Sequence, residues 1–329
     1  MHNNGFYKYD LNSPEDVISW KHLLSHYSLE EIHNRYENFK SLSLQNTVNF
    51  SRIESAISSI FEIDLKGKKI SPDFKICSTP EKTHPNTPHY FFRIRKLSKA
   101  FACKGSINGI NFGSIKIDEI NSLQDVWERP AEQINHFQRL SKPKESVLYT
   151  SLMSSTAILE TNIKEKDFFI LITYKGKKQF NFSDCRYFVY FNQLTEEENM
   201  KRYILFQLLR NEFTRILPSS YKEENQYCSA YHIFNKFFKH DNTISIQYPS
   251  TRGLGHNNFA FWDNIQDNLE FVGFRLCRLV EKEGTQSSTQ IFADGFWNSE
   301  LSKFEYYSPH SEKSKSIFED MYLKVMISK

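Results

Sequence analysis

Three side chains with complementary chemistry, Arg139, Tyr149 and Glu160, follow one another at intervals of ten and eleven residues. A glutamate carboxylate can hydrogen-bond a ribose hydroxyl and stabilise the positive charge that develops on a sugar during glycosyl transfer. An arginine guanidinium binds two phosphate oxygens at once, and a tyrosine offers a ring for stacking and a hydroxyl for orientation. The three residue types therefore suit glycosyl transfer from a substrate that carries a pyrophosphate.

Each of these residues also has an ordinary structural interpretation. A tyrosine in a strand followed by a glutamate on a helix is more often a packed aromatic side chain and a solvated acid. In the aromatic strand around Arg93, the arginine could form a structural ion pair. Ser250, in the run Tyr-Pro-Ser-Thr, could simply end a strand in a turn, and Asn258 could tie down a loop.

The elements that would position these side chains can be predicted locally. Residues 147–149 are β-branched, aliphatic and aromatic, which favours a strand that ends near Ser151. Ser154 and Ser155 are N-cap residue types, and a short helix is expected over 156–160. Glu160 would then lie about one and a half turns into the helix, close enough to share a pocket with the strand end.

The run VLYTSLMSSTAILE, which contains Tyr149 and Glu160, resembles the RES domain, a family of bacterial toxins that act on NAD. That family has an arginine ten residues before the tyrosine and a glutamate eleven residues after it, the spacings kept here. A downstream serine, an asparagine before an aromatic strand and an arginine in an early strand complete its pattern. The matching positions are Ser250, Asn258 and Arg93, and the resemblance covers roughly residues 89–281.

The resemblance implies a fold like that of diphtheria-toxin-type ADP-ribosyltransferases, with NAD as the substrate and no metal. Carried over residue by residue, it implies a catalytic group and an NAD-binding group. The catalytic residues would be Glu160, Arg139, Tyr149 and Ser250, and the NAD-binding residues Arg93, Arg139, Tyr149, Ser250 and Asn258. In one respect the chain departs from the family, which usually has a Gly-Gly-Arg-Trp-Asn type of run where this chain has Gln138-Arg139-Leu140-Ser141.

The activity that the resemblance implies is cleavage of the nicotinamide-ribose bond by hydrolysis or phosphorolysis, which would deplete cellular NAD and arrest growth. A transferase that places ADP-ribose on a protein or nucleic acid is an alternative, because the same pocket serves any nucleophile that reaches the anomeric carbon. A second alternative is an inactive NAD-binding module, which the glycine-free loop allows. Family members are typically paired with a separate antitoxin that carries a helix-turn-helix, and this is the partner expected here.

Composition narrows the class of protein. Hydrophobic residues make up 39% of the 329 residues, which is too many for a disordered chain, and no apolar run is long enough to span a bilayer. The net charge of +3 gives no general attraction to nucleic acid. Five scattered cysteines without a CxxC pair, and no signal-peptide pattern, favour a reducing cytoplasm. The eleven histidines show no zinc-binding spacing.

The predicted fold class is α+β, with a mixed β core, flanking helices and a small helical domain in front. Capping patterns at Ser13, Ser28 and Ser51 predict three helices within residues 1–85, which end in a proline-rich linker. Residues 86–329 would form the RES domain with a hairpin and helix at its end. Strands are expected at 90–97, 147–149, 167–174, 178–182, 243–247, 259–262, 269–280, 290–293 and 304–307, and helices at 122–128, 195–217, 223–238 and 311–326. Thr195 and Glu198 form a capping box at the start of the helix over 195–217, and the continuous apolar run from Phe168 to Tyr174 is typical of a buried strand. The N-terminal helices could serve as a sensor, an oligomerisation surface or a built-in restraint.

Overall fold

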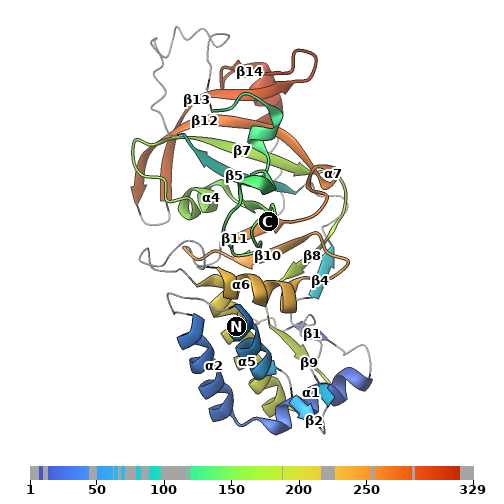
Figure 1. The fold of residues 1–329 in the computed structure, drawn as a ribbon. Coiled ribbons are helices and arrows are strands. Elements are labelled where there is room, and N and C mark those ends of the chain that lie inside the picture. The colour runs from blue at the N-terminus through green and yellow to red at the C-terminus, as the bar shows by residue number, and fades with distance from the viewer. Residues whose placement is uncertain are drawn as a thin grey trace. The chain divides into compact units, whose positions relative to one another are not determined.

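The structure is a computed structural model of the chain (Figure 1), and it describes residues 7–9, 14–43, 50–61, 63–65, 68–70, 79–82, 89–97, 117, 119–186, 188–215, 227–252, 256–283 and 286–318. The chain divides into two compact units. Unit 1 consists of Met1–Glu81, Pro130–Ser146 and Asn181–Tyr248. Unit 2 consists of Lys82–Arg129, Val147–Phe180 and Pro249–Lys329.

Unit 1 is built mainly from helices, with short strands at its margins. Its α-helices are α1 (Pro14–His26), α2 (Leu29–Ser43), α3 (Phe50–Phe61), α5 (Glu196–Thr214) and α6 (Cys228–Ile233), the last continued by a π-helical turn at Phe234–Phe238, and a 3-10 helix lies at Ala131–Gln133. Its strands are β1 (Tyr7–Tyr9), β2 (Ile63–Leu65), β3 (Lys68–Ile70), β8 (Asn181–Asp184) and β9 (Val189–Phe191), with most of β4 (Thr79–Lys82) and β10 (Ser245–Pro249). β1 pairs with β9, and β8 with β10, in parallel.

Two predicted capping boxes are confirmed by their hydrogen bonds. Before α2, the backbone N–H of Glu31 donates to Ser28 Oγ (3.1 Å) and the Ser28 N–H donates to the Glu31 carboxylate (2.9 Å). Thr195 and Glu198 make the same reciprocal pair before α5, at 3.2 and 2.7 Å. Ser51, predicted as the cap of the third helix, instead lies inside α3. Each box satisfies N–H groups that a helix start leaves without intrahelical partners.

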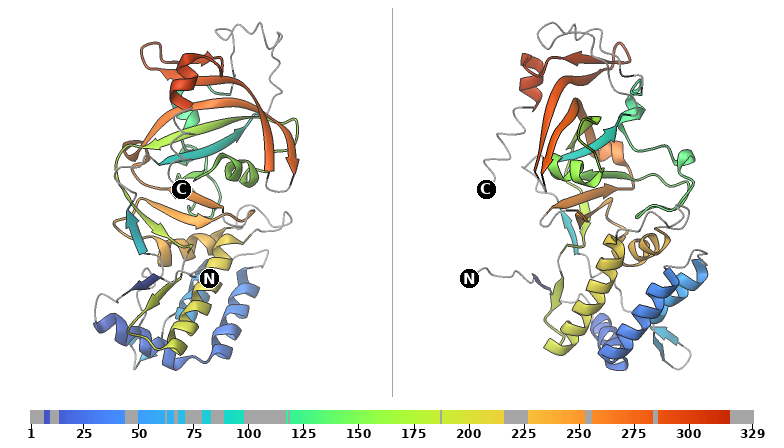
Figure 2. Two further views of the ribbon diagram at one scale, coloured as in Figure 1. Left: turned by 180° about the vertical axis from the view of Figure 1, so that it is seen from behind. Right: turned by 90° about the vertical axis from the view of Figure 1, so that its left-hand side faces the viewer.

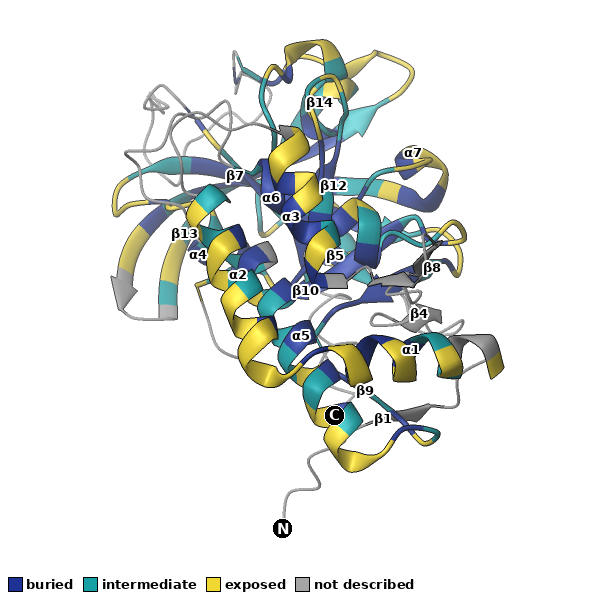
Figure 3. Cartoon of the chain, turned by 60° about the horizontal axis from the view of Figure 1, so that its bottom comes forward, coloured by how far each residue is buried: buried dark blue, intermediate teal, exposed yellow. Residues whose placement is uncertain are grey.

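The two units do not coincide with the predicted division of the chain at residue 85. The N-terminal helices share a unit with α5 and α6, because α1 and α2 pack on α5 while α3 packs on α6. Figure 3, coloured by residue burial, shows the amphipathic character of these helices: buried and exposed residues lie on different sides of α2 and of α5. Residues 86–329 therefore do not form one compact body of their own.

Unit 2 is organised around an antiparallel sheet. In order, its strands are β14 (Lys303–Tyr307), β13 (Gln286–Asn298), β12 (Leu269–Glu283), β7 (Phe168–Gly176), β5 (Tyr90–Lys96), β6 (Leu148–Ser151) and β11 (Asn257–Phe261). Short helices accompany them: a 3-10 helix at Leu123–Val126, α4 (Ser154–Glu160), α7 (Ile265–Asn268) and a final described helix at 312–318. Figure 2 shows the long β12–β13 hairpin curving over its length, and two register shifts interrupt its pairing.

The two faces of this sheet bury different side chains. On one face, Ala157 and Ile158 of α4 pack with Ile94 of β5 and with residues of β7 and β12. On the other face, Phe91 contacts the rings of Phe259 and Phe261, with centroids 5.2 and 5.1 Å apart. Successive side chains of a strand point to opposite faces, so the alternation along β5 assigns each of its residues to one of these layers.

Most of the expected elements are present, and the differences are mainly at their ends. β8 starts three residues after the strand expected at 178, and β13 extends well beyond the expected 290–293. The second helix of the predicted pair is described from Cys228 onward, and its expected start at 223 lies outside the described residues. The closing helix is described over 312–318, with the rest of the predicted span outside that range. The α+β class is confirmed.

Asp294 of β13 is fully buried where the final described helix meets the sheet. Its Oδ1 lies 3.4 Å from Arg275 Nε, and the Arg275 guanidinium lies over the ring of Phe318, 4.2 Å from its centroid. Burial raises the pKa of Asp294 from 3.8 to about 6, although Arg275, the Ser314 hydroxyl and His310 partly oppose the shift. The folded protein therefore binds a proton here more tightly than the unfolded chain does.

This raised pKa predicts a pH dependence of stability. Protonated Asp294 stabilises the folded state fully below pH 4, and this stabilisation is lost as the pH rises through about 6. Between these two pH values, Asp294 keeps its proton in the folded state but loses it in the unfolded chain. We expect the free energy of unfolding to fall by on the order of 2–3 kcal/mol between these limits. Urea unfolding at pH 4.5 and pH 7 should show the loss in the wild type and a smaller one in Asp294→Asn. Identical pH profiles of the two proteins would contradict it.

Candidate active site

Glu160, the last residue of α4, accepts hydrogen bonds from three residues that are distant in sequence. Its Oε1 accepts from Ser250 Oγ (2.5 Å), from Asn258 Nδ2 (3.0 Å) and from the backbone N–H of Thr251 (3.1 Å). Its Oε2 accepts a longer hydrogen bond from Thr251 Oγ1 (3.4 Å). A half-buried carboxylate with this many donors is fixed in position before any ligand arrives.

The donor groups are positioned by the pairing of β6 with β11. Asn258 is directly opposite Ser151 in this antiparallel ladder, and Ser151 Oγ donates to Asn258 Oδ1 (2.7 Å). That bond fixes which end of the amide is the acceptor, so the Asn258 NH₂ group is directed to Glu160. The backbone N–H of Ser250 donates to the His256 carbonyl (2.8 Å), which connects the residue after β10 to the residue before β11.

Several residues of this network were not singled out from the sequence. Thr251 contributes two of the bonds to Glu160, and Ser151 orients Asn258. His256 has Nδ1 2.6 Å from Thr156 Oγ1 of α4. Ser151 and Thr251 could have been found from the sequence, because each is a hydroxyl residue close to a predicted site residue, in the runs Tyr149-Thr150-Ser151 and Ser250-Thr251.

Tyr149 lies on the same face of the sheet as the Glu160 network. It is two residues before Ser151 on β6 and directly opposite Ala260, which is two residues after Asn258 on β11. Because side chains two residues apart on a strand share a face, Tyr149 projects to the side that carries Ser151 and Asn258. The structure therefore brings four predicted site residues to one layer, namely Tyr149, Glu160, Ser250 and Asn258.

Arg93 lies on the opposite face. It alternates with Phe92 and Ile94, which pack in the layer that contains α4. Its guanidinium donates to the backbone carbonyl of Trp127. Burial raises the pKa of the neighbouring Tyr174 to about 12 despite the lowering effect of Arg93. In the described part of the chain, Arg93 therefore lies on the other face of the sheet from Glu160, and its predicted role in NAD binding gains no support from the Glu160 network.

Arg139 belongs to unit 1, whereas Glu160 belongs to unit 2. One guanidinium nitrogen of Arg139 donates to the carbonyl of Arg215 (3.4 Å), and the group lies over the ring of Tyr227, 5.1 Å from its centroid. Nearby, burial raises the pKa of Glu212 above its usual value, although the positive charges of Arg215 and Arg139 partly oppose this shift. Within its own unit, Arg139 is therefore integrated into a partly buried charged cluster.

The geometry around Glu160 defines what the carboxylate can do. Oε1 already accepts three hydrogen bonds, whereas Oε2 accepts one long bond from the described residues, so Oε2 has capacity for a ligand hydroxyl. A fixed anion of this kind stabilises developing positive charge without having to reorganise.

Among the residues that the structure describes, no group of three or more His, Cys, Asp or Glu side chains is arranged to hold a metal ion. None of the described helices is both long enough and apolar enough to cross a membrane.

No protein-family model matches this chain, and no curated protein matches it in sequence.

Proposed function

We propose that this protein cleaves the nicotinamide-ribose bond of NAD, as the RES-type toxins that it resembles do. Glu160 would hydrogen-bond a ribose hydroxyl through Oε2 and stabilise the positive charge that develops on the ribose as nicotinamide leaves. Tyr149, on the same face, would stack on the nicotinamide or the ribose. Water or phosphate would then bond to the anomeric carbon and release its proton.

The observation that supports this proposal is the set of hydrogen bonds that Ser250, Thr251 and Asn258 donate to Glu160. A surface glutamate at the end of a helix needs no such support, and a solvated acid would gain little from it. A carboxylate that must act on a developing cation does need a fixed position. The ADP-ribosyltransferase-like fold, the NAD specificity and a separate helix-turn-helix antitoxin are part of this proposal.

Incubation of the purified chain with NAD, with and without phosphate, followed by mass spectrometry, tests the proposal. Hydrolysis yields nicotinamide and ADP-ribose, and phosphorolysis yields a phosphorylated ADP-ribose only when phosphate is present. Transfer adds one ADP-ribosyl group to a protein or nucleic acid acceptor. If no nicotinamide is released by folded protein under any of these conditions, the chain is not an NAD-cleaving enzyme.

The role of Arg139 gives a separate prediction. If its guanidinium binds the pyrophosphate, Arg139→Lys keeps the charge but loses the bidentate geometry, which should weaken NAD binding by ~1–3 kcal/mol. Calorimetric titration in a Glu160→Gln background, in which turnover no longer consumes the ligand, measures this directly. The unfolding midpoint serves as the control for the contacts of Arg139 with Arg215 and Tyr227. Unchanged NAD affinity with a lowered midpoint would make Arg139 a structural residue.

A further inference from the structure

A second site in unit 2 is separate from the Glu160 network, with which it shares no residue. It is a pocket of about 490 Å³ between the 3-10 helix at Leu123–Val126, the start of β12, the end of β13 and the final described helix. This volume falls within the range of pockets that hold small organic ligands. We propose that this pocket binds a small planar aromatic anion.

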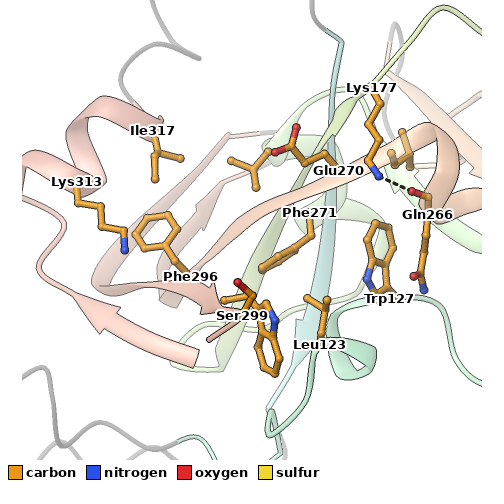
Figure 4. Close-up of a pocket in the computed structure, with 13 residues that line it drawn as sticks. Leu123, Trp127, Lys177, Gln266, Glu270, Phe271, Phe296, Ser299, Lys313 and Ile317 are labelled. Carbon is orange, nitrogen blue, oxygen red and sulfur yellow. Dashed lines mark hydrogen bonds between the residues drawn. The ribbon is translucent and has the colours of Figure 1, made fainter. Parts of the chain in front are cut away.

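Four of the side chains that line the pocket are aromatic. Trp127, Phe271, Phe296 and Trp297 all line it (Figure 4). Ring contacts fix the positions of several of these walls: Trp127 lies against Tyr174, with centroids 5.2 Å apart, and Trp297 lies against Phe304 at 5.0 Å. Flat rings supported from behind favour a flat, apolar ligand that can stack on them.

The charges at the rim favour an anion. Lys177 and Lys313 line the pocket together with one acid, Glu270. Among the described residues neither lysine has a carboxylate within ion-pair distance: Lys177 Nζ donates to the Gln266 carbonyl (2.8 Å), and Lys313 Nζ donates to the Tyr307 hydroxyl (3.1 Å). Each ammonium group has three N–H donors, so both retain capacity for a ligand.

The side chain of Trp127 provides independent support for ligand binding in this pocket. Its side chain is only 5% exposed, and its indole Nε1–H has no hydrogen-bond acceptor among the described residues. Figure 4 shows this nitrogen on the side of the ring that faces Phe271 and Leu123, inside the pocket. A buried donor without an acceptor destabilises the folded chain, and an acceptor atom on a bound ligand would satisfy it.

Three probes of similar size test separately whether the pocket requires a negative charge and whether it requires an aromatic ring. Naphthalene-2-sulfonate is planar, aromatic and anionic; 2-naphthylmethylammonium has the same ring system with a positive charge; cyclohexanesulfonate is anionic without an aromatic ring. Titration of the full chain, followed by calorimetry and tryptophan fluorescence, should show binding of naphthalene-2-sulfonate that is at least about tenfold tighter than that of either other probe. Comparable binding of all three, or no binding of the sulfonate, would overturn the proposal.

Charge-changing variants at the rim locate the site. Lys177→Gln and Lys313→Gln should each weaken binding of naphthalene-2-sulfonate by about three- to tenfold, while Glu270→Gln should tighten it by a similar factor. Lys178→Gln, at an exposed lysine next to Lys177 that does not line the pocket, is the matched control and should bind as the wild type does. If the four variants bind alike, the pocket is not where the anion binds.

The indole donor can be tested without emptying the pocket. Trp127→Phe keeps an aromatic wall but removes the N–H group, so binding should weaken by about three- to tenfold. The unfolding midpoint without ligand should be retained, because the buried donor that lacks an acceptor is removed as well. If Trp127→Phe retains the wild-type midpoint and the wild-type affinity, the indole N–H does not contact the ligand. If the midpoint falls sharply, Lys313→Gln and Glu270→Gln, which alter only exposed charges, still decide the proposal.

Discussion

Glu160→Gln is expected to reduce the rate of NAD cleavage by about a hundredfold or more while leaving the fold intact. Loss of an electrostatic contact to the transition state typically costs ~3 kcal/mol. The glutamine carbonyl oxygen can still accept from Ser250, Thr251 and Asn258, which surround Oε1. Its NH₂ group would replace Oε2, where Thr251 Oγ1 can reverse its role and accept. Only the negative charge and one ligand-facing acceptor are therefore removed.

Glu165→Gln is the matched control, because Glu165 is an exposed acid only five residues from Glu160 in the sequence. Release of nicotinamide, measured by mass spectrometry at saturating NAD, should be unchanged in that variant and largely lost in Glu160→Gln. Equal unfolding midpoints of the three proteins would show that the difference arises from chemistry. Wild-type turnover in Glu160→Gln would remove Glu160 from the active site.

The second large effect is expected in unit 1, where Arg202 of α5 is buried among aromatic rings. The side chain is 1% exposed, and its guanidinium carbon lies 3.5 Å from the ring centroid of Phe191 and 4.7 Å from that of Trp20. Arg202 Nη1 donates to Asn199 Oδ1 (3.1 Å). This cation therefore joins α5 to α1 and β9 through cation-π contacts in a site with little water.

Arg202→Ala should lower the free energy of unfolding by ~3–5 kcal/mol, because it leaves a cavity and removes every contact of the guanidinium. Arg202→Met fills much of the same space without a charge and should cost less than half as much. Equilibrium unfolding in urea measures both values. If the two variants are equally unstable, the cation-π and hydrogen-bonding contacts stabilise unit 1 more than the packing does.

Local sequence patterns predicted most of the elements. The capping boxes at Ser28 and Thr195 located the starts of α2 and α5, and the apolar run from Phe168 to Tyr174 located β7. Such features depend on neighbours within four residues along the chain, so they can be read without knowing the fold. The same local character placed Tyr149 on a strand and Glu160 on the helix that follows it.

The sequence alone could not predict how the chain divides into compact units. The three N-terminal helices are recognisable one by one, but their apolar faces do not identify the partner that covers them. The structure packs α1 and α2 on α5 and α3 on α6, segments that lie more than a hundred residues later. Hydrophobic burial is non-directional, so only the tertiary structure selects which faces meet.

The same distinction applies to the candidate site. The resemblance to the RES domain selected Glu160, Ser250 and Asn258, but only the tertiary structure shows a carboxylate that accepts from a serine 90 residues away and an amide 98 residues away. The register that sets Asn258 opposite Ser151 depends on long-range strand pairing, and a shift of one residue would turn the amide to the other face. Strand alternation places Arg93 on the face away from α4 for the same reason. The types and local spacing of the reactive residues belong to the sequence, whereas their convergence on one carboxylate depends on strand register and on the layer that each side chain enters.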